Sequence, residues 1–214
     1  MPTRSRVTRE AILEVATKVI SQTGAASLTF QTLGDMLGVS KQAIIYWYPS
    51  KADLARELIV PALRLEADAV VDALKRVRSA RRGIEVFLRA LIAFHLSDLG
   101  RFRLIYAVAQ FDPQIWQVAG LPHIADSVHQ TTDRMYTALE QILAQAPDFV
   151  NHSSARATAA AVHTSAVGLL SMLSLADAIH DPLAHAPDEL IDALVALTTG
   201  QRVGARHRTP KISQ

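Results

Sequence analysis

Apolar residues recur every three or four positions along most of this 214-residue chain, which is the spacing of an α-helix that buries one face. In the first segment, Ile12 and Val19 lie on such a face. Thr8 is a suitable N-cap and Gly24 a suitable stop, so we predict a first helix near residues 8–22.

The same spacing continues towards the C-terminus. It predicts helices after Thr29, from Ser40 to about Tyr48, from residue 51 into the seventies, and over residues 83–97, 101–110, 122–146, 153–177 and 188–199. No segment shows the sustained alternation of a half-buried strand, and we find no internal repeat. The sequence therefore predicts an all-α fold.

Residues 29–48 have the pattern of a helix-turn-helix: a short helix, a turn that contains glycine, and a second short helix. Gly38 can adopt the left-handed backbone conformation that a sharp helix exit requires. Leu33 and Ile44 are spaced to pack the two helices together. We expect the polar start of the second helix to enter the major groove of DNA.

That leading end carries Ser40, Lys41, Gln42 and Ala43. Ser40 can cap the helix, which leaves the three residues after it facing outward. The amide of Gln42 both donates and accepts, which matches N6 and N7 of adenine. The alternative is that Gln42 faces solvent or a phosphate.

The charge of the chain is unevenly distributed, although the net charge is only +2. Residues 1–51 hold six Lys and Arg against three acidic residues, and residues 201–214 hold four against none. Residues 52–200 hold 12 basic and 17 acidic side chains, a net charge of −5. A basic N-terminal region on an acidic body favours a polyanionic partner such as nucleic acid.

Several classes of protein are disfavoured by what the sequence lacks. Cysteine is absent, and there is no paired-histidine motif, P-loop, GxGxxG or GxSxG, so we predict no metal site, cofactor or catalytic residue. The first residues lack the uninterrupted apolar stretch of a secretory signal, so we expect none. Residues 157–176 lack charged side chains, but they are rich in alanine and contain His163, so we expect a buried helix of a cytoplasmic protein and no membrane span.

The run from Leu28 to Leu54 resembles the DNA-binding region of the TetR family of transcriptional regulators, and the resemblance covers roughly residues 6–60. Its most specific part is Gly38-Val39-Ser40, then Tyr46, Trp47 and Tyr48, then Pro49-Ser50-Lys51 with Leu54. The resemblance implies a third helix that reads bases, an aromatic end and a lysine that hold phosphates, and a dimerising, ligand-binding domain formed by the remaining helices.

By this resemblance and the helix-turn-helix pattern, the candidate DNA-binding residues are Thr29, Ser40, Lys41, Gln42, Ala43, Tyr46, Trp47 and Lys51. Two positions depart from the family pattern. Ile45 stands where the family often has tyrosine, which removes one hydroxyl contact to phosphate. Gln42 stands where a small residue is usual, and its amide could read adenine.

Some of these residues also suit a structural role. The three aromatic side chains could pack between the third and fourth helices; we expect Tyr48 in the core and Tyr46 at the DNA, and we leave Trp47 open. Lys51 could simply be solvated, but a cation at a helix N-terminus is slightly unfavourable, which favours a phosphate contact. Arginines near the N-terminus form either a solvated arm or a DNA contact: Arg4, Arg6 and Arg9.

The predicted body combines apolar stripes with bulky aromatic residues that could line a pocket, although any helical core uses the same residues. Histidines within its helices could anchor a ligand or be ordinary core or surface residues. The candidate ligand-binding residues are Phe94, His95, Phe102, Tyr106, Trp116, Tyr136 and His163.

The last two predicted helices are the candidate dimerisation elements, because small side chains permit close helix packing and two helices from each subunit could form a four-helix interface. The alternative is that the same side chains are buried inside one subunit. The candidate interface residues are Val162, Ala166, Leu169, Leu170, Leu173, Leu190 and Leu194.

We therefore predict a helix-turn-helix DNA-binding domain at residues 1–50, a larger helical ligand-binding and dimerisation domain at residues 51–200, and a basic tail at residues 201–214. The expected function is that of a cytoplasmic, homodimeric repressor that a small, largely apolar effector releases from a palindromic DNA operator. The alternatives are an activator, an architectural DNA-binding protein, and a helical small-molecule-binding protein or enzyme with a vestigial DNA head.

Overall fold

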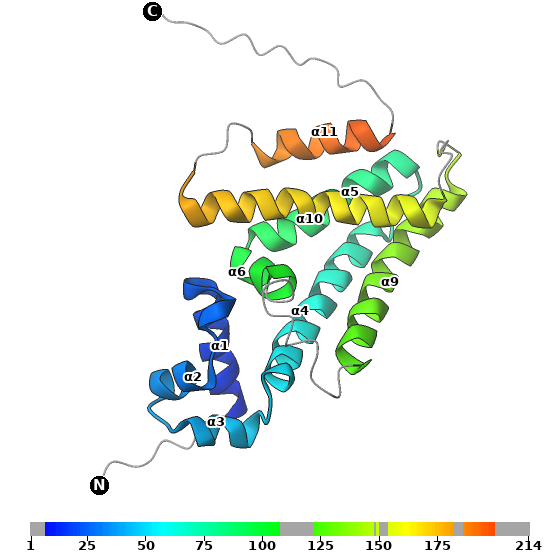
Figure 1. Cartoon of the computed structure of the whole chain (residues 1–214). Helices are drawn as coiled ribbons and strands as arrows, with labels where there is room; N and C mark the ends of the chain where they lie inside the picture. Colours follow the sequence, from blue (N-terminus) through cyan, green and yellow to red (C-terminus); the bar gives the residue numbers. More distant parts are fainter. Residues whose placement is uncertain (1–6, 108–121, 148, 150–153, 182–185, 200–214) are drawn as a thin grey trace, which may run out of the picture.

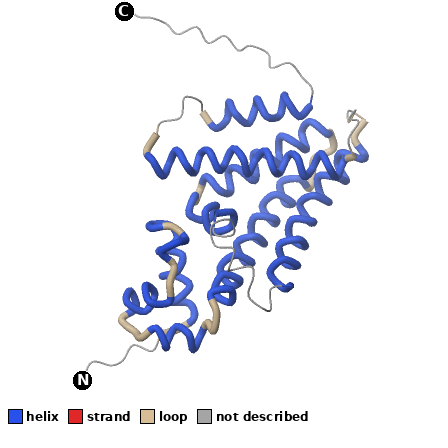
Figure 2. Tube along the Cα trace, in the orientation of Figure 1, coloured by secondary structure: helices blue, strands red, loops and turns tan. Residues whose placement is uncertain are grey.

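The computed structural model describes residues 7–107, 122–147, 149, 154–181 and 186–199 (Figure 1). Within these ranges every regular element is helical and there is no strand, as the sequence predicts (Figure 2). The basic tail expected at residues 201–214 lies outside the described residues.

Three helices form an N-terminal head: α1 (Arg9–Thr23), α2 (Phe30–Leu37) and α3 (Lys41–Trp47), with a 3-10 turn, η1 (Ala25–Ser27), between the first two. Each helix starts at a hydroxyl side chain that accepts a hydrogen bond from the backbone amide three residues on. These caps are Thr8, Thr29 and Ser40. Gly38 ends α2 in the left-handed conformation, with φ +65° and ψ +31°, so the predicted caps and glycine exit are confirmed.

The body contains six helices and one π-helical turn within the described residues. They are α4 (Lys51–Leu74), α5 (Ala80–Leu96), α6 (Leu99–Phe102), the π-turn η2 (Arg103–Ala107), α9 (Pro122–Gln145), α10 (Ala155–Ile179) and α11 (Pro187–Thr199). In Figure 1, α4 and α9 run side by side, and α10 packs across α9 and α5 above the head. α11 packs mainly on α5.

Two of these helices start earlier than the apolar spacing suggests. α5 begins at Ala80, because the Ser79 hydroxyl accepts a hydrogen bond from the amide of Arg82 and caps the helix there. α6 begins after a cap at Asp98 and passes into the π-turn. The single helix expected over residues 101–110 is therefore a short α-helix followed by a wider turn, as far as residue 107.

Buried apolar side chains form two clusters that share α4. The head cluster joins α1, α2 and α3 to the first half of α4, including Leu54 and Leu63, and it also contains Leu104 and Ile105 of η2. The body cluster begins at Ala67 and joins the second half of α4 to α5, α9, α10 and α11. A single continuous helix thus belongs to both cores.

α10 is long and apolar enough to cross a membrane by length and composition alone, with a mean hydropathy of 1.5 over its most apolar window. Half of that window is buried inside the protein, where α10 packs on α5 and α9. The expected burial of this helix is confirmed for its inner face. Its outer face is exposed and includes Met172, Leu175 and Ile179.

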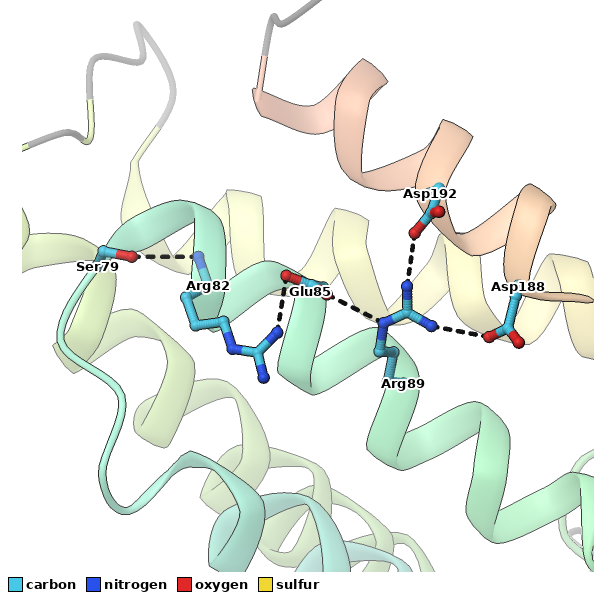
Figure 3. Close-up of polar contacts among 6 residues, drawn as sticks. All are labelled: Ser79, Arg82, Glu85, Arg89, Asp188 and Asp192. Carbon is cyan, nitrogen blue, oxygen red and sulfur yellow. Dashed lines mark hydrogen bonds and ion pairs between the residues drawn. The ribbon is translucent and has the colours of Figure 1, made fainter. Parts of the chain in front are cut away.

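α11 is tied to α5 by a cluster of ion pairs around Arg89 (Figure 3). The Arg89 guanidinium lies 2.8 Å from Asp188, 2.5 Å from Asp192 and 3.1 Å from Glu85. Glu85 also pairs with Arg82 at 2.9 Å. An isolated exposed ion pair contributes about 1 kcal/mol or less, so the main consequence of this cluster is to fix where α11 lies on α5.

Candidate functional site

The two helices of the helix-turn-helix approach each other closely at a glycine. The backbone N–H of Val39 donates to the carbonyl of Gly34 across 2.9 Å. A Cβ atom at Gly34 would lie 2.8 Å from the carbonyl oxygen of Val39, so only glycine allows this approach. Leu33 and Ile44 are fully buried between the helices, as predicted.

The first turn of α3 presents its side chains to solvent. Lys41 and Gln42 are exposed, and Ala43 is half-buried. The Ser40 hydroxyl accepts a hydrogen bond from the amide of Ala43 at 3.2 Å, and the Thr29 hydroxyl caps α2 in the same way. Ser40 and Thr29 therefore hold the helix starts, which positions the two exposed side chains.

The aromatic residues at the end of α3 occupy three different environments. Tyr46 is 81% exposed, and its ring meets that of Trp47 edge to face at 5.6 Å. Trp47 is half-buried against the head cluster. Tyr48 is fully buried, which confirms its predicted place in the core. Lys51 is exposed at the first position of α4.

Tyr48 links the helix-turn-helix to α1 and α4. Its hydroxyl donates to Glu57 across 2.8 Å, and burial together with this carboxylate raises the pKa of Tyr48 above its ordinary value. Arg9 pairs with the same carboxylate at 3.0 Å and lies over the Tyr48 ring. Arg9 is thus engaged within the head, whereas Arg4 and Arg6 lie outside the described residues.

Inside the body, the structure brings together five of the seven candidate ligand-binding residues. They are His95, Phe102, Tyr106, Tyr136 and His163. Phe94 is half-buried with its ring 5.0 Å from that of His95, and the Arg101 guanidinium lies 4.3 Å from the Phe94 ring centroid. Trp116 lies outside the described residues.

These residues surround a buried carboxylate, Glu66 of α4, which the sequence reasoning missed. Both His95 and Glu66 are fully buried, and His95 Nε2 lies 3.0 Å from Glu66 Oε2. The Tyr106 hydroxyl donates to Glu66 Oε1 at 2.8 Å. His163 lies beyond Tyr106, with 3.0 Å between Nε2 and the Tyr106 hydroxyl and 2.9 Å between Nδ1 and the Tyr136 hydroxyl. We call Glu66, His95, Tyr106, Tyr136 and His163 the polar centre.

The polar centre draws one residue from each of five elements: α4, α5, η2, α9 and α10. Its hydrogen bonds run in one direction if both rings are neutral. Tyr136 donates to His163 Nδ1, His163 Nε2–H donates to Tyr106, and Tyr106 donates to Glu66. Since Nε2 of His95 faces the carboxylate, that nitrogen carries the ring hydrogen.

Burial lowers the pKa of His163 below its usual value, although Glu66 acts in the opposite direction, so the ring is neutral near pH 7. Burial and the neighbouring carboxylate raise the pKa of Tyr106 far above its usual value. One buried polar side-chain atom has no hydrogen-bond partner among the described residues, and it is Nδ1 of His95. Within the same ranges, no group of three histidine or acidic side chains is placed to hold a metal ion.

A signal for Glu66 was present in the sequence. Leu63, Ala67 and Val70 form the apolar stripe of α4, and Glu66 falls on that stripe. An acidic residue on a buried helical face requires hydrogen-bond donors, so its position alone marks a polar site in the core.

The predicted dimerisation residues of α10 need a correction. Val162, Ala166, Leu169, Leu170 and Leu173 are at most 7% exposed and belong to the body cluster of one subunit. The alternative of burial within the subunit therefore holds for these five side chains. Of the α11 candidates, Leu190 and Leu194 are half-buried against the same cluster.

These features define a helix-turn-helix head on a larger helical body with a buried polar centre. The family model for bacterial regulatory proteins of the tetR family matches residues 12–58. No curated protein matches the sequence. The TetR-family regulator PfmR from Thermus thermophilus has a similar fold, with TM-score 0.65 and 20% identity over 92% of this chain and 98% of that chain.

Two further solved structures share this fold. A tetR-family regulatory protein from Rhodococcus RHA1 is 18% identical, with TM-score 0.66 over 91% of this chain and 97% of that one. FadR from Bacillus subtilis, in complex with stearoyl-CoA, is 12% identical, with TM-score 0.66 over 92% of this chain and all of that one. The N-terminal head of the chain thus matches the tetR-family model, and the whole chain shares the fold of these solved structures.

Proposed function

We propose that this chain is a cytoplasmic, homodimeric repressor that binds a palindromic DNA operator and is released from it by a small-molecule effector. The observation that carries the proposal is the exposed first turn of α3. Lys41 and Gln42 extend from a helix start that is capped by Ser40 and supported by the buried Ile44. This is the geometry of a recognition helix that reads base edges in the major groove.

The surroundings of α3 support a phosphate-binding role for its flanks. Tyr46 holds its ring in solvent at the end of α3, and Lys51 is exposed at the start of α4. Aromatic hydroxyls and lysines of this kind position a recognition helix on the DNA backbone. Gln42 would then supply sequence preference, and Lys51 would supply affinity for any duplex.

The polar centre is the proposed effector site. FadR, which shares the fold, binds stearoyl-CoA, so a body of this kind can hold a small molecule. A ligand at the polar centre would act on α4 through Glu66 and on η2 through Tyr106. Because α4 and η2 also contribute to the head cluster, their displacement would move the two recognition helices relative to each other.

The proposed dimer interface is the outer face of α10 together with α11. Met172, Leu175 and Ile179 are each 61% exposed, and they lie at helical spacing on one face of α10. Leu197 of α11 is 77% exposed. Large apolar side chains grouped in this way favour a covered surface, and a two-fold dimer covers the same patch on both copies.

A selection of bound fragments from random duplex DNA tests the proposal. We expect a palindromic motif with two half-sites about one helical turn or slightly more apart, and a dimer in sedimentation. Recovery of random fragments, or of a single half-site by a monomer, would contradict the homodimeric repressor. Once the motif is known, transcription from a promoter that contains it should fall when the protein is added.

A further inference from the structure

The proposed effector site contains a buried carboxylate with no lysine or arginine partner among the described residues. In the polar centre, Glu66 is fully buried and receives hydrogen bonds only from neutral groups when His95 and His163 are neutral. No lysine or arginine side chain of the described residues bonds to it in the structure. A buried carboxylate without a cationic partner is electrostatically costly, and a positively charged ligand would relieve that cost.

The unpartnered nitrogen of His95 points to the same ligand chemistry. Because Nε2 donates to Glu66, the neutral ring has a lone pair on Nδ1, which is an acceptor. Buried acceptors are normally satisfied, so this one calls for a hydrogen-bond donor. Since Nδ1 and Nε2 point to opposite sides of the ring, a cationic donor at Nδ1 would lie across the imidazole from Glu66 and would act on the carboxylate through His95.

A surface groove borders the polar centre at Tyr136. The groove has a volume of about 430 Å³ and lies beside α9 and the start of α10. Tyr136 lines it and also donates to His163 of the polar centre. The Arg156 guanidinium lies 5.0 Å from the centroid of the Tyr136 ring and is neutralised by ion pairs with Asp133 and Glu140.

Arg156, the guanidinium that lines the groove, pairs with Asp133 and Glu140, whereas Glu66 of the polar centre pairs with no lysine or arginine of the described residues. The rings of Phe102, Tyr106 and Tyr136 supply apolar faces of the kind that attract cations. An anionic ligand would therefore meet the Glu66 charge at the polar centre and, among the groove residues that the structure describes, an Arg156 already paired with two carboxylates.

We propose that the effector is a protonated amine on an apolar or aromatic body, and that its ammonium group binds at Nδ1 of His95, across the imidazole ring from Glu66. The proposal rests on the proposed function, because it names the ligand class of that effector site. The ammonium group donates to His95 and offsets the Glu66 charge, while the apolar part packs among the aromatic rings.

Three matched probes test this proposal on the full chain: phenylbutylamine, phenylbutanol and phenylbutyrate. They share one aromatic body and differ in charge. We measure binding by calorimetry and by the shift in the unfolding midpoint. Phenylbutylamine should bind roughly tenfold or more tightly than the alcohol, as expected for a hydrogen bond to a charged group, and phenylbutyrate should bind most weakly.

Glu66→Gln sharpens the test, because it changes the acceptor pattern as well as the charge. If the amide oxygen keeps accepting from Tyr106, the NH2 of the new side chain faces His95 Nε2, which moves the ring hydrogen to Nδ1 and turns the free acceptor into a donor. The variant should lose its preference for the amine. Asp68→Asn is the matched control, since Asp68 is an exposed residue of the same helix that pairs with Arg134 at 2.7 Å, and it should keep the preference.

The inference is overturned if phenylbutyrate binds as tightly as the amine, if no probe binds, or if Glu66→Gln retains the amine preference. The ranking of probes in the unmodified chain decides the matter even where the variant does not fold. DNA binding is measured on the same samples. Palindrome binding with an anion-selective body would overturn this inference alone, and amine-selective binding without DNA binding would overturn the regulator proposal alone.

Discussion

The hydroxyl of Tyr106 donates to Glu66 across 2.8 Å, and this contact joins the π-turn η2 to the middle of α4. Ile105, the residue before Tyr106, packs in the head cluster. Neighbouring residues of one turn therefore contact the polar centre and the core of the DNA-binding head. A displacement of Tyr106 at the polar centre would therefore act directly on its neighbour Ile105 in the head cluster.

Tyr106→Phe tests the strength of this contact. The change removes a donor from a buried carboxylate and an acceptor from His163, so the free energy of unfolding should fall by about 1–3 kcal/mol. Urea denaturation measures the effect. Tyr46→Phe is the control, since Tyr46 is 81% exposed, and it should change stability by less than about 0.5 kcal/mol. Equal effects of the two substitutions would contradict the assigned role of the Tyr106 hydroxyl.

Gly34 and Gly38 are predicted to respond differently to substitution. Gly34→Ala places a Cβ against the backbone of Val39 and should destabilise the head by about 1–3 kcal/mol, with loss of DNA binding. Gly38→Asn should cost under about 1 kcal/mol, because asparagine tolerates the left-handed conformation and the space is open. Thermal unfolding and DNA binding of the two variants would be compared; a Gly34→Ala variant as stable as the unmodified chain would refute the close approach.

Gln42→Ala and Lys51→Ala separate base reading from phosphate binding. The first should leave binding to random duplex nearly intact and reduce discrimination at one base pair of each half-site by about 1–3 kcal/mol. The second should weaken specific and random binding by a similar factor. It should also reduce the magnitude of the negative slope of log K against log salt by about one. A selection repeated with each variant checks this. An unchanged sequence preference would mean that Gln42 reads no base.

The outer face of α10 is predicted to control the oligomeric state. Met172→Glu with Leu175→Glu should give a folded monomer in sedimentation, because two exposed apolar residues of the proposed interface become charged. Leu169→Ala, on the inner face, should instead lower the free energy of unfolding by about 2–5 kcal/mol and leave the folded mass unchanged. A dimer that persists in the double variant would place the interface elsewhere.

Stability should depend on pH through His163. Its pKa is lowered in the folded protein, so below about 6.5 the unfolded chain binds a proton that the folded chain resists. The free energy of unfolding should therefore decline as the pH falls below about 6.5, and His163→Gln should make that decline shallower. Denaturation at several pH values measures it, with the exposed His129→Gln as control. If His163→Gln has the same pH profile as the unmodified chain, His163 is not the responsible group.

The helix caps and the glycine that ends α2 were predictable from the sequence, because each depends on residues only a few positions away along the chain. Ser40 and Gly38 behave as their residue types suggest. Glu66 was not predicted, although its place on the apolar stripe of α4 indicates burial. The partners of Glu66 come from other elements, and pairings of that kind depend on the tertiary fold.

The face of α10 that meets its own subunit could not be derived from periodicity. Val162, Ala166 and Leu173 form the buried stripe, while Met172 and Leu175 form an exposed one, and both stripes are apolar at helical spacing. A helix that is apolar on two sides gives no preference for either side. The choice is made by the surfaces of α5 and α9 that α10 covers.

The sharing of α4 between the two clusters determines how the molecule can be divided experimentally. A fragment that ended at residue 50 would lack Leu54, Ile59 and Leu63, against which the head core packs, and would expose that core to water. A stable, soluble head for spectroscopy or for fusion to another protein must therefore extend at least through Leu63. The head therefore cannot be moved to another protein without the first half of α4.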